Sequence, residues 1–231
     1  MGTLFSPLLR ALSQLDDRVF LGVLLQSLLW ASAFFAGLHV AAVWGAHQLL
    51  RIEGPLAWAA DLLASIGASL AALWLFLPVA ALIGTLYFDR IAQAVERRYY
   101  PGLPPPAGAS LAAQLWDGLA LGLRILLLNL LALVMALLLP GVGLLLGWLV
   151  AAYAIGRGLF VAVAMRRMPR PAAEYLYRAN RAAVLAQGAA MAAAGSIPLL
   201  NLLVPVIGTA AMVHLLDSAM TRAAPPRPGA V

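Results

Sequence analysis

Residues 19–45 read VFLGVLLQSLLWASAFFAGLHVAAVWG and contain no charged side chain. As a helix this stretch would be about 40 Å long, whereas the hydrocarbon core of a bilayer is about 30 Å thick. The tripeptide at 31–33 resembles a signal-peptidase site, but the apolar run continues past it, and Asp16 and Asp17 stand where a secretory signal carries positive charge. The stretch therefore predicts a retained transmembrane helix.

The composition of the whole chain agrees with this prediction. Of its 231 residues 64% are hydrophobic and 10% are charged, and its mean hydropathy is +0.93. A soluble domain has about 45–50% apolar and about 25% charged residues. A soluble globular enzyme and a disordered chain are both excluded. Without cysteine, the chain also has no disulfide and no thiolate metal site.

A second uncharged run covers residues 62–88, and its pattern then becomes amphipathic. Ile91, Ala92 and Val95 fall on one helical face, while charged side chains fall mostly elsewhere. Prolines from position 101 onward end the pattern. We therefore expect a transmembrane helix over residues 62–100 with a cytoplasmic extension.

Two hairpins are expected in the second half, over residues 111–165 with a tip at 140–143 and over residues 182–220 with a tip at 198–205. Their arms look short, because the uncharged run 125–139 is only about 22 Å long as a helix. Arg157 interrupts the next arm. The tips carry the residues that end helices, namely Pro140, Gly141, Gly143, Pro198 and Pro205.

The arginines predict the sidedness of the chain. Twelve of the fifteen would lie on one side if every run or hairpin returns the chain, so both termini are expected in the cytoplasm. Six full spans would give the same sidedness as two spans with two re-entrant hairpins. Arg124 and Arg157 favour partial penetration, because a lipid-facing charge at mid-bilayer costs at least about 2.5–3.5 kcal/mol.

The expected fold is thus a single all-α membrane domain, residues 1–231. It has two long transmembrane helices, two short re-entrant helical hairpins and an amphipathic N-terminal segment. The arginines lie at the ends of apolar runs rather than in a basic helix, so no nucleic-acid partner is predicted.

Three segments resemble one known family. Residues 87–96 (YFDRIAQAVE) are similar to the segment that follows the second helix of CysZ-type sulfate permeases, the etoposide-induced-protein-like membrane family. Residues 139–143 (LPGVG) resemble the family's Ile-Pro-Gly-Ile-Gly turn, and residues 197–203 (IPLLNLL) resemble its Ile-Pro-Leu-Leu-Asn-Leu stretch. The resemblance implies a bacterial inner-membrane protein that passes sulfate into the cytoplasm for cysteine synthesis. It also implies two long helices and two partly penetrating hairpins.

The chain departs from the family just before the first long helix. There the family places a glycine, an apolar residue and one or two arginines, where backbone amides and guanidinium groups hold an anion. Only Arg18 carries over, Val19 takes the place of a second arginine, and Asp16 and Asp17 precede them. Arg18 is either an anion contact or a topology arginine paired with one of these carboxylates.

Three further residues are candidates for the anion pathway. Arg124 either faces the path or snorkels to the interface. Arg157 either lines a pore or is held in a salt bridge. Asn201 either caps the second hairpin tip or contacts the ligand. We expect the remaining polar residues of the apolar runs, Asp117, His214 and Asp217, at interfaces or paired with arginines.

The sequence therefore predicts an inner-membrane permease or channel for a small inorganic anion, with sulfate suggested by the resemblance. A non-transporting membrane-shaping or scaffold protein, or a permease for another anion, are the alternatives. No enzyme activity, cofactor or metal site is predicted, since no nucleophile motif and no ligand cluster is present. The expected partners are sulfate or a similar oxyanion, the lipid bilayer and further copies of the chain in a homo-oligomer.

Overall fold

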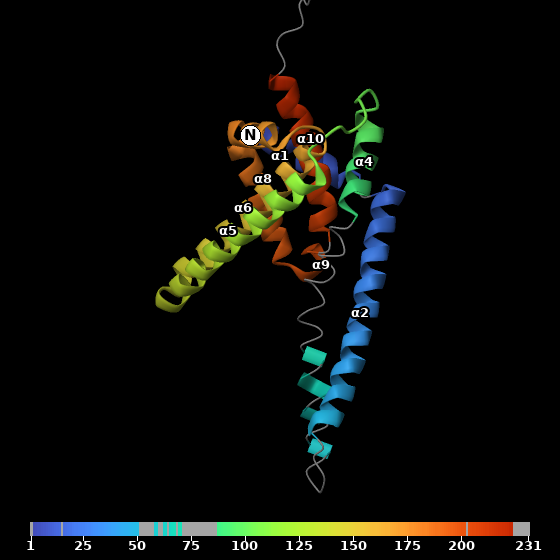
Figure 1. Cartoon of the computed structure of the whole chain (residues 1–231), viewed down its shortest axis with the longest axis vertical. Helices are drawn as coiled ribbons and strands as arrows, with labels where there is room; N and C mark the ends of the chain where they lie inside the picture. Colours follow the sequence, from blue (N-terminus) through green and yellow to red (C-terminus); the bar gives the residue numbers. More distant parts are fainter. Residues whose placement is uncertain are drawn as a thin grey trace, which may run out of the picture.

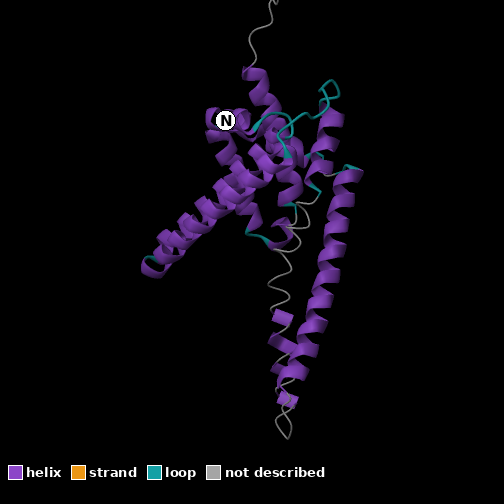
Figure 2. Ribbon diagram, in the orientation of Figure 1, coloured by secondary structure: helices purple, strands orange, loops and turns teal. Residues whose placement is uncertain are grey.

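The computed structural model describes residues 2–14, 16–50, 58–59, 62–63, 65–67, 69–70, 87–201 and 203–223. Over these residues the chain forms helices joined by turns and loops, with no strand (Figure 2). The described helices include α1 (Gly2–Leu12), α2 (Arg18–Leu50), α4 (Phe88–Tyr99), α5 (Leu111–Leu138), α6 (Pro140–Met165), α7 (Arg170–Ala179), α8 (Arg181–Gly195), α9 (Pro198–Asn201) and α10 (Val204–Ala223). The all-helical expectation is confirmed over this part of the chain.

The first apolar run forms one continuous helix. α2 has 33 residues, about 50 Å of helix, and projects away from the other helices along most of its length (Figure 1). Of the expected helix over residues 62–100, residues 64, 68 and 71–86 lie outside the described residues. Its amphipathic part is a separate helix rather than a continuous extension, because α4 begins at Phe88 after a turn at Tyr87. Ser69 Oγ lies 3.4 Å from His39 Nδ1, so the described part of this run lies beside α2.

The amphipathic segments predicted from the sequence pack as expected. In α4, Ile91, Ala92 and Val95 are fully buried against α10 and α2. In the N-terminal helix α1, Ala11 is buried while Arg10 stays exposed, and α1 lies against α10 and α8. Both helices therefore belong to the compact end of the molecule.

The first hairpin has the bounds predicted for it, residues 111–165. α5 has 28 residues and α6 has 26, so each helix is longer than the uncharged run 125–139 from which short arms were expected. α5 begins at Leu111, where Ser110 Oγ accepts a hydrogen bond from the backbone N–H of Ala113. α6 runs through Arg157 without a break, because its flanking glycines weaken a helix by only about 1 kcal/mol each.

The turn of this hairpin is a single residue. Leu139 joins α5 to α6, and Pro140 already stands in the first turn of α6, where its missing N–H costs nothing. A Cβ on Gly143 would overlap the backbone of Ala136, so glycine is required where the two helices leave the turn. The tip predicted at 140–143 is thus displaced toward the N-terminus.

The second hairpin is shorter and is preceded by a separate helix. α8 has 15 residues, about 22 Å, and α9 with its flanking turns forms the tip. The observed tip ends before the predicted limit at residue 205, because Pro205 already lies in the first turn of α10. α7 stands between the hairpins and buries Ala173 and Leu176.

The core lies where α6, α8 and α10 meet α1, α4 and the start of α2. Its largest fully buried apolar side chains include Phe20, Ile91, Phe160, Met165 and Met212. α6 and α8 touch through their backbones, since a Cβ on Gly156 would stand 2.8 Å from the carbonyl oxygen of Val184 and one on Gly188 would overlap that of Ala152. This contact fixes α6 against the core just before Arg157.

Large apolar surfaces outside this core remain uncovered. Many leucines of α5 are exposed, and Leu137, which lies near the hairpin turn, is 77% exposed. Soluble monomers rarely expose continuous apolar surface on this scale. Four helical segments in the described part of the chain are long and apolar enough to cross a membrane: Arg18–Ala41, Leu111–Leu138, Gly141–Met165 and Val204–Arg222. The α5–α6 turn and the end of α2 both point away from the compact end (Figure 1).

Candidate functional site

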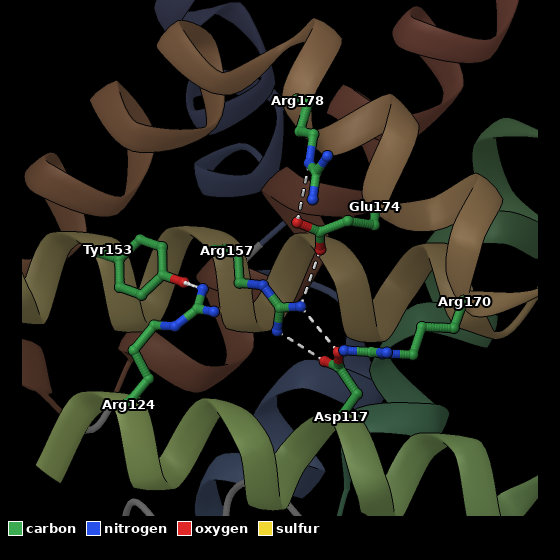
Figure 3. Close-up of polar contacts among 7 residues, drawn as sticks. All are labelled: Asp117, Arg124, Tyr153, Arg157, Arg170, Glu174 and Arg178. Carbon is green, nitrogen blue, oxygen red and sulfur yellow. Dashed lines mark hydrogen bonds and ion pairs between the residues drawn. The ribbon is translucent and has the colours of Figure 1, made fainter. Parts of the chain in front are cut away.

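A buried arginine lies near the open end of the first hairpin, away from its turn. Arg157 of α6 is only 5% exposed, and Asp117 of α5 lies directly opposite it (Figure 3). Arg157 Nη1 donates to Asp117 Oδ2 at 2.7 Å, and Nη2 donates to Oδ1 at 2.8 Å. Arg157 is therefore held in a salt bridge, one of the two roles predicted for it, and the prediction that Asp117 pairs with an arginine is confirmed.

Helix α7 closes over this pair. Pro169 precedes α7 in an extended conformation and Pro171 stands in its first turn, which starts the helix beside α5. Arg170 Nε donates to Asp117 Oδ1 at 2.8 Å. Glu174 Oε2 accepts a hydrogen bond of 2.9 Å from Arg157 Nη2. Charged side chains thus link all three helices at this point.

Two features of the cluster distinguish its members. The Asp117 carboxylate is saturated by Arg157 and Arg170, and its side chain is 9% exposed. The Nε of Arg157 is buried and has no hydrogen-bond partner among the described residues. A buried donor without a partner costs about 1–3 kcal/mol, more for a charged group. Arg157 therefore retains an unsatisfied binding capacity.

An open cavity of about 540 Å³ lies beside the cluster. It is lined by Arg124, Arg157, Arg170, Pro171, Glu174, Tyr175 and Arg178. Arg124 comes from α5 and is held by Tyr153, whose hydroxyl accepts a hydrogen bond of 3.0 Å from Nη1. Arg178 Nε lies 3.5 Å from Glu174 Oε1.

The charges of this wall favour an anion. Four guanidinium groups face the space, and Glu174 is the one carboxylate among the lining side chains. Guanidinium groups present forks of N–H donors that match the oxygens of a small oxyanion. The space is many times larger than the roughly 30 Å³ that one water occupies, so an anion can enter with part of its hydration shell.

Residues 7–205 match the family model described as "Sulfate transporter CysZ/Etoposide-induced protein 2.4". The chain belongs to this family. The matched residues include all of the cavity wall and stop at the start of α10. No curated protein and no solved structure matches the chain.

Arg18, the residue that the family resemblance singled out, does not line this cavity. It is exposed at the first position of α2. Asp17 Oδ1 accepts a hydrogen bond of 2.8 Å from the backbone N–H of Val19 and so satisfies the start of α2. Arg98 of α4 lies 3.5 Å from Asp17 Oδ2 and 3.7 Å from Asp16 Oδ1. The acidic pair that departs from the family pattern thus binds α4 to the start of α2.

The other predicted residues also lie outside the cavity wall. Asn201 is half-buried in α9, and its Oδ1 would be 3.3 Å from a Cβ placed on Gly195 at the end of α8. The tip residues of both hairpins are likewise absent from the lining, and these are Pro140, Gly141, Gly143, Pro198 and Pro205. Of the four predicted pathway residues, Arg124 and Arg157 share the cavity.

The role of α7 was not predicted from the sequence. Arg170, Glu174 and Arg178 follow one another at intervals of four, which places them on one face of a helix. That spacing was a usable signal. Asp117 was another, because it is the only carboxylate between residues 97 and 173. A single buried acid and a single buried base in one apolar hairpin need each other.

A second ion cluster joins α6 to α4. Glu96 is buried and accepts hydrogen bonds from Arg166 Nη1 at 2.9 Å and from Arg167 Nε at 3.1 Å. Arg166 Nε also donates to Asp89 at 2.8 Å. Glu96 ends the segment that resembles the family after its second helix, so this motif has a structural explanation: it anchors α4 at the end of α6.

A buried histidine joins the N- and C-terminal helices. His214 of α10 is fully buried between Gln14 and Tyr100, with its Nε2 2.6 Å from Gln14 Nε2 and its Nδ1 2.7 Å from the Tyr100 hydroxyl. It lies at a helix interface, as predicted. Burial, together with the nearby Asp217 carboxylate, raises the pKa of Tyr100 to about 12.

Proposed function

We propose that this protein is a permease or channel for a small inorganic anion in a bacterial inner membrane, with sulfate as the first candidate cargo. The observation that carries the proposal is the cavity beside Arg157, which is lined by four guanidinium groups and a single carboxylate. The description of the family names sulfate transporters, which supports the same cargo.

The cavity suits passage rather than permanent capture. Arg124 and Arg178 are exposed, so their N–H donors can replace part of an anion's hydration shell without burying the anion. Tyr153 holds Arg124 through a neutral hydroxyl, which positions its guanidinium without neutralising it. A site of this kind binds strongly enough to admit an anion and weakly enough to release it.

The charged cluster also bears on how deeply the hairpins enter the bilayer. Beyond Arg124, residues 125–138 of α5 are uncharged and make about 21 Å of helix, less than the roughly 30 Å hydrocarbon core. With Arg124 and Arg157 at the cytoplasmic interface, the first hairpin is re-entrant. α8, with 15 residues and about 22 Å, is also shorter than the hydrocarbon core. Both termini then lie in the cytoplasm, on the side of the arginines.

A path across the bilayer requires more than one copy of such a hairpin. Hairpins that stop within the membrane do not seal it alone, and irregular tips at that depth must face protein or water. The uncovered leucines near the α5–α6 turn offer apolar surface for a neighbouring copy. The permease is therefore a homo-oligomer in this proposal.

Uptake of radiolabelled sulfate into proteoliposomes that contain the purified full-length chain tests the function. We expect uptake above that of empty vesicles, and a loss of at least about tenfold in Arg124→Gln and in Arg178→Gln, since each removes a charged donor of the cavity. Arg222→Gln is the matched control, because Arg222 lies on α10 outside the cavity and is expected to leave uptake unchanged.

Folded protein whose uptake equals that of empty vesicles would overturn the sulfate proposal, and is the result that a scaffold protein predicts. Competition by unlabelled phosphate, chloride and nitrate in the same assay identifies a different cargo. Both arginine variants are at exposed positions, so loss of uptake in them reports on the cavity rather than on folding.

A further inference from the structure

We propose that Glu174 is an internal counter-ion of the cavity. Its carboxylate pairs with Arg157 when no anion is bound, and it moves away from Arg157 when a transported anion binds. The inference rests on the proposed function of the same cavity and adds a residue that regulates it. It starts from a difference between the two carboxylates that hold Arg157.

Asp117 and Glu174 are held in different ways. Asp117 makes a two-pronged contact with Arg157 and a third hydrogen bond with Arg170, and its side chain is 9% exposed. Glu174 makes one hydrogen bond of 2.9 Å with Arg157 and a looser contact of 3.5 Å with Arg178, and its side chain is 25% exposed. Asp117 is therefore a fixed partner, whereas Glu174 is held on one side only and borders the cavity.

The guanidinium of Arg157 is incompletely used on the side that Glu174 occupies. Its Nη1 and Nη2 atoms form the edge that binds Asp117. Its Nε and Nη2 atoms form the adjacent edge, where Glu174 contacts Nη2 while Nε has no partner among the described residues. An oxyanion with two suitably spaced oxygens can bind both atoms of this edge, which is the stronger arrangement.

The loosely held position of Glu174 allows the exchange. Its carboxylate sits at the end of a flexible side chain on α7, and Arg178 lies one turn further along the same exposed face. Rotation about its own side-chain bonds moves the carboxylate from Arg157 while it remains near Arg178. No helix has to shift, because α7 stays anchored through Ala173 and Leu176.

The exchange also limits the change in net charge at the site when an anion binds or leaves. If Glu174 stayed in place, an arriving anion would meet a negative charge within about 4 Å of its own oxygens, which opposes binding. If the anion left and Glu174 did not return, Arg157 would keep Asp117 as its one carboxylate partner. Return of Glu174 therefore assists release, so removal of its charge is expected to tighten binding and slow turnover.

Binding of radiolabelled sulfate to the purified full-length protein is the first measurement. We expect Glu174→Gln, which keeps the size and removes the charge, to lower the dissociation constant for sulfate by about tenfold relative to wild type. Asp89→Asn removes the same charge from an exposed residue outside the cavity and is expected to bind as wild type does. In proteoliposomes, Glu174→Gln is expected to lower the maximal uptake rate while half-saturation falls.

Each result decides between the two proposals. Unchanged or weaker sulfate binding by folded Glu174→Gln, when wild type binds and transports sulfate, overturns the counter-ion and leaves the permease standing. Absence of sulfate binding and uptake in wild type and every variant overturns the permease and, with it, the counter-ion. If Glu174→Gln does not fold, Glu174→Asp replaces it. The shorter carboxylate cannot reach Arg157 and Arg178 together, so tighter binding is again expected, and wild-type affinity there would contradict the inference.

Discussion

Asp117 and Arg157 are 40 residues apart in sequence and meet through two parallel hydrogen bonds of 2.7 and 2.8 Å in the interior of the α5–α6 hairpin. The pair is the point to which Arg170 and Glu174 of α7 are attached. The same few atoms therefore determine both the stability of this part of the protein and its capacity to bind an anion.

Arg157→Leu is expected to destabilise the protein strongly. The change removes the two-pronged partner of Asp117 and leaves Arg170 as its one remaining partner, and breaking a buried ion pair costs up to about 3–5 kcal/mol. Thermal unfolding of the purified protein in detergent measures the loss. Asp117→Leu combined with Arg157→Leu is expected to recover part of it, because the double change removes both charges. Equal melting temperatures for wild type and Arg157→Leu would contradict the importance of the pair.

Gly188→Ala is expected to separate α6 from α8. The added Cβ would overlap the carbonyl oxygen of Ala152, and backbone atoms cannot yield as a side chain can. A forced overlap in a packed core costs about 1–3 kcal/mol, visible as a lower melting temperature. Gly147→Ala is the matched control on α6, since nothing lies within 4 Å of its Cβ position. A Gly188→Ala protein as stable as that control would refute the close contact.

Tyr100 is expected to make stability depend on alkaline pH. The folded protein raises the pKa of Tyr100 from 10.0 to about 12, so folding favours the neutral phenol. The contribution is fully present below pH 10.0 and is lost as the pH rises through about 12. Tyr100→Phe should be less stable than wild type at neutral pH, and the difference should shrink over this interval. Melting curves at stepped pH test this, and a constant difference would contradict it.

Tyr153→Phe is expected to weaken anion binding about two- to fivefold, which corresponds to loss of one modest hydrogen bond. Without the hydroxyl, Arg124 loses the contact that positions its guanidinium at the cavity. Sulfate titration by calorimetry measures the change. Tyr87→Phe serves as the control, because Tyr87 lies outside the cavity wall. An unaltered affinity in Tyr153→Phe would mean that Arg124 needs no positioning.

The lack of cysteine makes the depth of the first hairpin directly testable. A single cysteine in place of Gly141, next to the α5–α6 turn, is expected to resist a membrane-impermeant thiol reagent added outside intact cells. Glu53→Cys, in the loop that the sequence places outside, is expected to react, and Ser13→Cys, between α1 and α2, to react only in opened cells. Labelling of Gly141→Cys from outside would show that the hairpin crosses the bilayer.

Much of the fold follows from hydrophobic patterning. The uncharged run at 19–45 predicted α2, and the period of Ile91, Ala92 and Val95 predicted the buried face of α4. The uncharged run at 125–139 understated the lengths of α5 and α6. Hydropathy counts Asp117 and Arg157 against an apolar helix, whereas both lie within these helices and neutralise each other.

The candidate site was predicted in part. Arg124 and Arg157 were identified because charges in apolar runs are costly and need a reason. Glu174 and Arg178 were missed because they lie in a basic stretch that reads as a solvated loop, and only the position of α7 brings them to Arg157. Arg18 was selected from a motif, and the motif does not report that Arg18 lies outside the lining of this cavity.

The charges of Asp117 and Arg157 cancel within the α5–α6 hairpin, because both residues belong to it. The hairpin therefore carries a neutral pair on its inner face, and the cost of placing these two charges beside lipid is met without residues 170–178. Arg157 thus has one carboxylate partner from its own hairpin, which is permanent, and one from α7, which is exchangeable.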